Sequence, residues 1–438
     1  MIEDEKKGTA LMGVLDEGER TLDHVRGLLS LLEAVRSGKA STRPELVECS
    51  GLGRNVVAQR VSTLQEAGLF REGNLARSNG GRAPRRITFC AEAGLILSAQ
   101  LGATSLAVAI SDLAGNLSHV HVEDADITDG PEVALSRVNE LFAKMLSARE
   151  GGAMVWGIGI GLPGPVEFAT GQPVVPPIMP GWNGFDVRAY FSSRYNAPVW
   201  ADNDVNLIAL GELRSGLAKS DLDFICLKVG SGIGAGLVSQ GRLHRGAQGS
   251  AGDIGHIVSS DSSAVVCRCG KRGCLEALAG GTAVGMRGEQ VARAGNSALL
   301  AARLHASGSV SAEDVADAAG RGDAVARDLL QESAAMVGEA VSTLVNLFNP
   351  SLVLLCGGVI GAGDFYLAQI RTTILERSLP LATRSLRILP SMNSDHAGLR
   401  GAAFMVLDQI FSPALFQRWF PLGSPAGYPG LVERTPRG

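Results

Sequence analysis

Apolar positions in the first ninety residues follow the 3.6-residue period of helices, whereas those after residue 90 gather into short continuous runs. In the stretch 22–38, one helical face collects Val25, Leu28, Leu29, Leu32 and Val35. The Gly-Lys pair at the end of this stretch is a suitable helix stop. We therefore predict an amphipathic helix over 22–38.

The segment 41–70 predicts a second helical unit. Ser41 or Thr42 is a suitable N-cap for a short helix, a Ser-Gly-Leu turn follows, and a longer helix runs from about Gly53 to Ala67. A short helix, a tight turn and a longer helix form the helix-turn-helix pattern. Its apolar face, expected to pack inward, consists of Val56, Val57, Val61 and Leu64.

The polar side chains of the longer helix are of the types that read DNA bases or grip phosphates. They occupy its start and outer face, and comprise Arg54, Asn55, Gln59 and Arg60. Residues 70–89 carry Gly, Asn and Pro turn signals and are interpreted as a wing followed by a linker. Between residues 50 and 90 the chain has seven arginines and two glutamates, so this region is locally basic.

The remainder of the chain is typical of an α/β fold. Apolar, strand-like runs ending in glycine occupy 95–117, 155–166, 224–238 and 351–363, with helical stretches between them. Turns of this kind bring backbone N–H groups close to a phosphate or a sugar. The last residues, 412–438, are rich in Pro and Gly and are predicted to be loosely structured.

Composition narrows the class of protein. A chain of 438 residues with 45% hydrophobic and 19% charged content predicts two or three globular domains. The net charge of −4 gives no overall attraction to nucleic acid, so DNA contact must come from the local basic region. The charged N-terminus does not resemble a signal peptide, and no apolar run reaches a membrane span of ~18 residues. We expect a cytoplasmic protein with reduced thiols.

Three of the seven cysteines fall within eight positions of one another, in the stretch GHIVSSDSSAVVCRCGKRGCLEA. His256, Cys267, Cys269 and Cys274 supply one imidazole and three thiolates, the donor set of a tetrahedral Zn²⁺ site. Four protein ligands leave no open position, so the sequence predicts one structural zinc per chain. The alternative, reduced thiols packed in a loop, does not account for the glycines that allow the chain to turn at Gly270 and Gly273.

This segment resembles the zinc motif of the ROK family, which contains bacterial sugar-responsive repressors and sugar kinases. The family motif runs from Gly-His through Cys-x-Cys-Gly-x-x-Gly-Cys to Leu-Glu, and this chain has it from Gly255 to Glu276. The segments PVWADNDVNLIALGE (198–212), GLPGPV (161–166) and PGW (180–182) also resemble the family's sugar cleft. The resemblance covers roughly residues 20–410.

The resemblance implies a two-lobed α/β body of the actin-like, hexokinase-like ATPase type, with an N-terminal winged helix-turn-helix domain. It also places five side chains around a sugar: Asn203, Asp204, Asp253, His256 and Glu276. His256 would hold the metal with one ring nitrogen and offer the other to a sugar hydroxyl. Asp253 departs from the family pattern, which has a longer Glu at this position.

The first glycine turn distinguishes a kinase from a regulator. Kinases of the family use the counterpart of Asp204 as a general base, together with a phosphate loop resembling Asp-x-Gly-Gly-Thr. Here the stretch 100–105 reads QLGATS, so Gln100 replaces the aspartate expected near Mg²⁺ and Ala103 replaces a glycine. A neutral amide does not balance the charge of a metal, and a Cβ crowds the phosphate, so ATP chemistry should suffer.

The Gly-Gly-Arg stretch at Gly80, Gly81 and Arg82 matches the linker of the resembled repressors, where such an arginine enters a narrow minor groove.

We therefore predict a sugar-responsive transcription regulator, most simply a repressor, that binds operator DNA as a homodimer or dimer of dimers. A ROK sugar kinase with an extra N-terminal domain is the alternative. A protein-interaction module is a third interpretation, disfavoured by the intact set of sugar-pocket residues. The expected domains are 15–88, 91–208, 209–411 and the tail 412–438.

Overall fold

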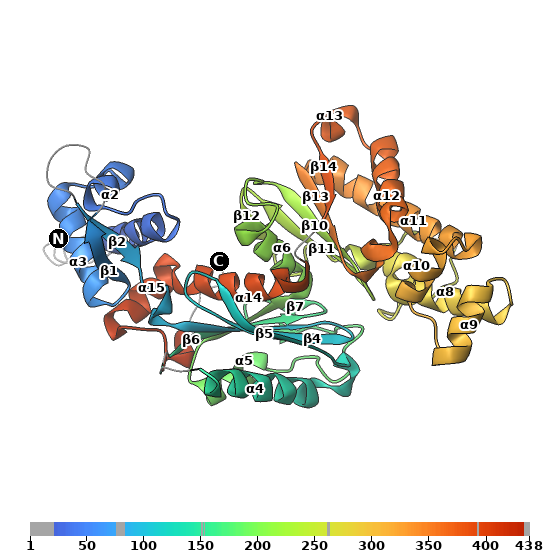
Figure 1. Cartoon of the computed structure of the whole chain (residues 1–438), viewed down its shortest axis with the longest axis horizontal. Helices are drawn as coiled ribbons and strands as arrows, with labels where there is room; N and C mark the ends of the chain where they lie inside the picture. The colour runs from blue at the N-terminus through green and yellow to red at the C-terminus, as the bar shows by residue number, and fades with distance from the viewer. Residues whose placement is uncertain are drawn as a thin grey trace, which may run out of the picture.

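A small N-terminal domain and two larger lobes make up the protein, and they follow one another along its longest axis (Figure 1). Each lobe is built on a five-stranded mixed sheet, and the first lobe lies between the N-terminal domain and the second lobe. The computed structural model describes residues 22–75, 84–149, 152, 154–260, 263–391 and 394–432. No helix within these residues combines the length and the apolar character needed to cross a bilayer.

The N-terminal domain has the helix-turn-helix that the hydrophobic pattern predicts and the wing that the turn signals predict. Its elements are a helix over 22–36, α2 (Arg43–Ser50), α3 (Arg54–Glu66), β1 (Phe70–Leu75) and β2 (Arg85–Phe89). The Thr42 side chain caps α2 by accepting a hydrogen bond from the Glu45 N–H, and Gly51 ends the helix with a left-handed φ of 67°. The strands β1 and β2 pair antiparallel as the wing.

The core of this domain comes mainly from the first helix and α3. Val57, Val61 and Leu64 are buried against apolar residues of the first helix. Val56 was expected to pack with them, but its side chain is 39% exposed. It precedes the buried Val57 by one position, and the rotation of about 100° between them on a helix turns Val56 toward solvent.

The first lobe contains a sheet in the order β5-β4-β3-β6-β9. The first three strands along the chain pair antiparallel, and β6 and β9 add in parallel. Helices α4 (Pro131–Ser147) and α5 (Val187–Tyr195) lie on one side of the sheet, opposite α14 (Figure 1). The strands are β3 (Leu95–Leu101), β4 (Ser105–Ser111), β5 (Leu117–Asp124), β6 (Val155–Leu162) and β9 (Val199–Asn203), with a small hairpin of β7 (Val166–Glu167) and β8 (Gln172–Pro173).

The second lobe repeats this strand order as β12-β11-β10-β13-β14. Again three antiparallel strands are followed by two parallel additions. The strands are β10 (Phe224–Val229), β11 (Ile233–Ser239), β12 (Arg242–His244), β13 (Leu352–Cys356) and β14 (Arg387–Pro390). Its helices are α7 (Leu275–Ala279), α8 (Gly281–Arg293), α9 (Ala298–Ser307), α10 (Ala312–Gly320), α11 (Ala324–Phe348), α12 (Asp364–Arg377) and α13 (Pro380–Thr383).

Two crossing helices join the lobes. α6 (Asp204–Ser215) follows the last strand of the first sheet and packs on β10 and β11 of the second, whereas α14 (Ser394–Ile410) follows the last strand of the second sheet and packs on β3 and β6 of the first. The helices touch backbone to backbone, because a Cβ on Gly401 would lie 1.7 Å from the Leu207 carbonyl oxygen. Only glycine permits this approach.

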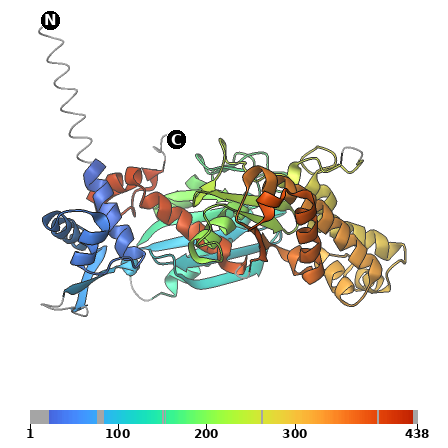
Figure 2. The same ribbon diagram turned by 90° about the horizontal axis from the view of Figure 1, so that it is seen from above.

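The C-terminal residues differ from the loose tail expected from 412 onward. Residues 413–432 form α15 (Pro413–Trp419) and two short 3-10 helices, Phe420–Leu422 and Pro429–Leu431. Phe416 and Trp419 are buried, and their core is continuous with that of the N-terminal domain. The apolar surface that this segment buries outweighs its Pro and Gly content. Figure 2 shows α15, in red, against the blue N-terminal domain.

Candidate functional site

A cleft of about 270 Å³ opens between the two lobes. The first lobe contributes the turn after β3, the loop 163–165 and the start of α6. The second lobe contributes the turn after β10, the segment 249–253 and the start of α7. The site is thus assembled from residues far apart in sequence, at the point where the crossing helix α6 begins.

All five residues predicted to surround a sugar line this cleft: Asn203, Asp204, Asp253, His256 and Glu276. Asn203 is also the N-cap of α6, because its Oδ1 accepts from the Val205 and Asn206 N–H groups and its Nδ2 donates to the Gly164 carbonyl at 3.1 Å. Glu276 Oε2 accepts from the Ile233 N–H at 3.1 Å. Both side chains therefore hold the walls of the cleft as well as facing it.

Asp204 is paired with a residue that sequence reasoning missed. The Lys228 Nζ lies 2.5 Å from Asp204 Oδ2, and the two side chains are 27% and 5% exposed. Burial works to lower the pKa of Lys228, but the attraction and hydrogen bond of Asp204, together with the neighbouring Cys356 and Cys226, raise it, and the net pKa is raised. The available signal was a single lysine in the apolar run FICLKV, which the strand pairing places at the cleft.

A second ion pair, also missed, holds the segment that leads to Asp253. Asp202 is fully buried, and its Oδ2 lies 2.7 Å from Arg245 Nε. Its Oδ1 accepts from Asn206 Nδ2 at 2.9 Å, and the Arg245 guanidinium lies 3.9 Å from the centre of the Phe168 ring. Arg245 follows β12 of the second lobe, so this pair ties the two lobes together beside the cleft.

The predicted metal ligands converge. One ligand atom from each of His256, Cys267, Cys269 and Cys274 lies within 4.8 Å of all the others. His256 Nδ1 is 3.5 Å from Cys267 Sγ, and Cys269 Sγ is 3.7 Å from Cys274 Sγ. Tetrahedral bonds of 2.0–2.3 Å to a zinc ion place ligand atoms roughly 3.3–3.8 Å apart. The donor set and these separations therefore fit a zinc ion.

Glycine conformation and thiol chemistry also suit this loop to a metal. Gly270 and Gly273 have φ of 87° and 68°, and a Cβ on Gly273 would lie 2.1 Å from the Ser260 carbonyl oxygen. Without a cation, burial and the neighbouring thiols raise the pKa of Cys274 to about 12, so a bound cation must displace its proton. With Nδ1 toward the thiols, His256 turns Nε2 toward Asp253 Oδ1, 3.9 Å away.

The first glycine turn lines the cleft through residues 102–105, but Gln100 does not. Gln100 packs against α14, where a Cβ on Gly398 would meet its side-chain amide. The amide is therefore directed to the crossing helix α14 and not into the cleft.

The residues predicted to bind DNA have different surroundings. Arg54, Asn55 and Gln59 are exposed on α3. Arg60 is half-buried and reaches back to the first helix, where its Nη2 donates to the Asp23 carbonyl at 3.4 Å and its guanidinium lies over Gly27. Arg82, with Gly80 and Gly81, lies outside the described residues.

The repeated strand order of the two lobes, with a polar cleft between them, defines an actin-like α/β body. The chain belongs to the ROK family, whose model matches residues 96–409. The xylose repressor of Bacillus spizizenii is 27% identical over 87% of this chain and 94% of its own length.

Two solved structures of the family are similar to different shares of this chain. A ROK family transcriptional regulator, described as a homologue of the E. coli Mlc protein, superposes with a TM-score of 0.75 and 26% identity over 94% of this chain and all of that chain. A ROK family glucokinase from Streptomyces griseus, in complex with glucose and AMPPNP, has a TM-score of 0.63 and 28% identity over 71% of this chain and 99% of its own. The likeness to the regulator covers more of this chain than the likeness to the kinase.

Proposed function

We propose that the protein is a sugar-responsive, DNA-binding transcription regulator, most simply a repressor. The observation that carries this proposal is the helix-turn-helix and wing, which share one hydrophobic core with α14 and α15 of the ROK body. A domain that shares a core with the body is placed to respond to changes in that body. The full-length likeness to a xylose repressor supports the same function.

Sugar is the proposed effector. Asn203, Asp204, Asp253, His256 and Glu276 line one cleft with carboxylate, amide and imidazole groups, which suit a hydroxyl-rich ligand. His256, Cys267, Cys269 and Cys274 would hold one structural zinc ion, which fixes the loop carrying His256 at the cleft wall. The metal fills its four positions with protein ligands and takes no part in chemistry.

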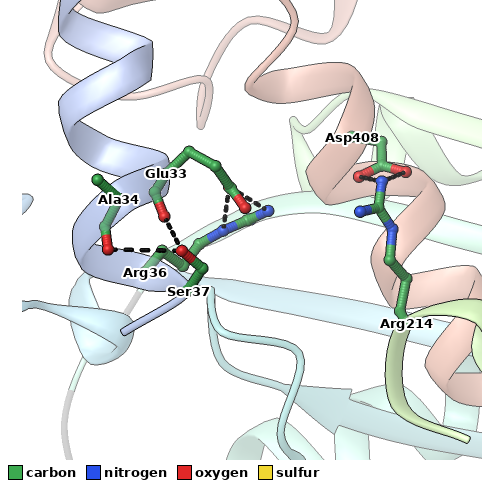
Figure 3. A network of polar contacts seen from close by, with 6 residues as sticks. All are labelled: Glu33, Ala34, Arg36, Ser37, Arg214 and Asp408. Atoms are coloured by element: carbon green, nitrogen blue, oxygen red, sulfur yellow. Dashed lines mark hydrogen bonds and ion pairs between the residues drawn. The ribbon is translucent and has the colours of Figure 1, made fainter. Parts of the chain in front are cut away.

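The crossing helices provide a route from the cleft to the DNA-binding domain. α6 begins at Asp204 and ends near Arg214, whose Nη2 lies 2.8 and 2.7 Å from the two oxygens of Asp408 on α14 (Figure 3). Just beyond α14, the Phe411 ring contacts the wing at Phe89, with centroids 6.4 Å apart, and the first helix at Arg36, 5.5 Å from the guanidinium carbon. A sugar that moves one lobe against the other would shift these contacts.

DNA contact is assigned to the exposed start of α3. Arg54, Asn55 and Gln59 are free for base and phosphate contacts, whereas Arg60 would have to leave the first helix to join them. A helix-turn-helix of this kind reads a half-site, so a homodimer on a palindromic operator is the proposed assembly. Arg82 would add a minor-groove contact from the linker.

The test pairs DNA selection with sugar titration. Selection from a random duplex library should yield a palindromic site, and affinity for it should fall steeply with salt. A sugar identified by thermal shift should change that affinity, and the operator should change sugar affinity by the reciprocal factor. Failure to select any site, or a selected site bound equally well after Arg54→Ala and Gln59→Ala, would refute the regulator assignment.

A ROK sugar kinase is the second candidate, favoured by the cleft and by the likeness to a glucokinase bound to glucose and AMPPNP. Two observations oppose it: Gln100 faces α14, and Ala103 stands in the first turn. A coupled ATP-turnover assay over a sugar panel distinguishes the two functions. Turnover at ordinary kinase rates, about 1–100 per second, would establish the kinase.

A further inference from the structure

Lys228 gives the cleft a charge that neither the motif nor the zinc loop accounts for. Of the described residues that line the cleft, it alone has a side chain that is permanently cationic at neutral pH. Its Nζ contacts Asp204 Oδ2 at 2.5 Å, and neither side chain forms another hydrogen bond within the described part of the chain. The pair therefore retains the Oδ1 acceptor and two ammonium donors, and both residues line the cleft.

The pairing limits what Asp204 does to a bound hydroxyl. The contact with Lys228 occupies Asp204 Oδ2 and leaves Oδ1 as the acceptor for a ligand hydroxyl. The Lys228 ammonium beside it can donate to the oxygen of the same hydroxyl. Asp204 therefore serves as a held acceptor that orients a hydroxyl.

The rest of the cleft opposes an anionic ligand. Asp204, Asp253, Glu276 and Glu313 all line it, against the single ammonium of Lys228. Glu313 reaches the cleft at Gly358, where a Cβ would lie 2.6 Å from its Oε1. A phosphate ester would add about −1.5 to −2 charges to this surplus. Neutral hydroxyl groups meet no such repulsion.

Resting on the proposed sugar-binding function, we propose that Lys228 and Asp204 together read one hydroxyl of a neutral, unphosphorylated sugar and discriminate against sugar phosphates. Lys228 is then a specificity-determining residue of the cleft. Its donors complement the sugar oxygen while Asp204 Oδ1 accepts the sugar proton in a hydrogen bond.

The first experiment screens the zinc-loaded full-length protein by thermal shift against neutral monosaccharides and their phosphate esters, followed by calorimetry on each hit. We expect a neutral sugar to bind and its phosphate ester to bind at least tenfold more weakly. An ester that binds as tightly as the free sugar, or more tightly, overturns the discrimination. Absence of binding by every sugar and ester refutes the proposed function itself, a result distinct from binding of an ester.

The second experiment tests Lys228 directly. Lys228→Met keeps an unbranched side chain, one atom shorter, and removes its charge, and should weaken binding of the neutral sugar at least tenfold. The control Lys219→Met makes the same change on an exposed lysine outside the cleft and should leave affinity unchanged. If Lys228→Met does not fold, the double variant Lys228→Met with Asp204→Asn removes both charges together. Wild-type affinity in either cleft variant overturns the proposal.

A third measurement separates reading of a hydroxyl from a structural role. In a series of monodeoxy analogues of the bound sugar, the analogue lacking the recognised hydroxyl should lose affinity for the wild type and lose much less for Lys228→Met. This non-additivity is the signature of a direct contact. Equal losses for both proteins, at every deoxy position, would show that Lys228 does not contact the sugar.

Discussion

The two lobes have the same strand order, but at the end of the first strand one lobe has a neutral side chain and the other a charged one. In each, the first strand ends one residue after a polar side chain, Gln100 in β3 and Lys228 in β10, and a glycine turn follows. Gln100 faces α14, whereas Lys228 reaches into the cleft and contacts Asp204. The shared topology places both strand ends and their turns in equivalent positions. Because one side chain is an amide and the other an ammonium, only the second lobe contributes a charge from this position.

The lobes also differ in what holds their loops. The first lobe binds its cleft loops with backbone and side-chain hydrogen bonds such as that from Asn203 to Gly164. The second lobe has a cluster of one imidazole and three thiols. A metal should therefore matter far more to the second lobe than to the first.

The largest expected effect follows from this difference. Because structural zinc contributes an apparent ~10–16 kcal/mol in small zinc domains, Cys269→Ser should abolish tight zinc binding and lower the melting temperature. Elemental analysis should find about one zinc per wild-type chain, and hydrogen exchange should locate the loss of protection to the second lobe. Cys49→Ser, an exposed cysteine outside the cluster, is the control. A zinc-free wild type would contradict the prediction.

A second change breaks the junction at which the lobes meet. Gly401→Ala would force a methyl group onto the Leu207 carbonyl, so we expect destabilisation of at least about 1–3 kcal/mol. In Gly320→Ala the added methyl meets open space at the end of α10, and this control should be neutral or slightly stabilising. Urea denaturation measures both. Equal free energies of unfolding for the two variants would mean that α6 and α14 can move apart without loss of stability, and would contradict the prediction.

A third change asks whether both lobes contribute to ligand affinity. Asp204→Ala removes the first lobe's acceptor and leaves Lys228 unpaired, so sugar affinity should fall roughly ten- to hundredfold, the loss of one charged hydrogen bond. Calorimetry with the bound sugar measures the change. Asp328→Ala, at an exposed position on α11, is the control. Unchanged affinity in Asp204→Ala would place the ligand elsewhere.

A smaller effect is expected at the far end of the crossing helices. Arg214→Met removes the contact to Asp408, a partly exposed pair worth about 0.2–1 kcal/mol. Sugar affinity should stay the same while the sugar-induced change in operator affinity falls about two- to fivefold. Arg194→Met, at an exposed arginine on α5, should leave the coupling intact. An identical loss in both variants would exclude the α6–α14 route.

The smallest effect concerns pH and the outer edge of the first lobe. Hydrogen bonds from Arg137 and His121 lower the pKa of Glu123 from 4.5 to about 2. Because the pKa of Glu123 is depressed in the folded state, the ionised carboxylate contributes its full stability above pH 4.5. This stability is lost as the pH falls toward 2. Glu123→Gln should therefore flatten acid unfolding in this window. An unchanged acid profile would show that the pair contributes nothing measurable.

Local signals predicted local structure well. Thr42, Gly51 and Gly53 mark helix ends in the sequence, and the structure begins or ends helices at those residues. The spacing of Cys267, Cys269 and Cys274 predicted a cluster that does converge. In each case, residues close together in the chain determine the geometry.

Long-range contacts were not accessible in the same way. Lys228 looks like one polar residue in an apolar strand until the sheet and α6 bring Asp204 to it, 24 positions away in the chain. The Pro and Gly residues after 412 predicted a loose tail, but the segment is folded. Phe416 and Trp419 are buried against parts of the chain hundreds of positions earlier, which the local pattern does not indicate. Such partners follow from topology, which the pattern of a single segment does not contain.

The aromatic contact between Trp156 and Trp419, with ring centroids 5.2 Å apart, has an optical consequence. All four tryptophans, Trp156, Trp182, Trp200 and Trp419, belong to the first lobe or to its junction with the N-terminal domain. Tryptophan fluorescence therefore does not report the interior of the second lobe. A change in tryptophan emission on ligand addition would report the first lobe and its junction with the N-terminal domain, without any attached dye.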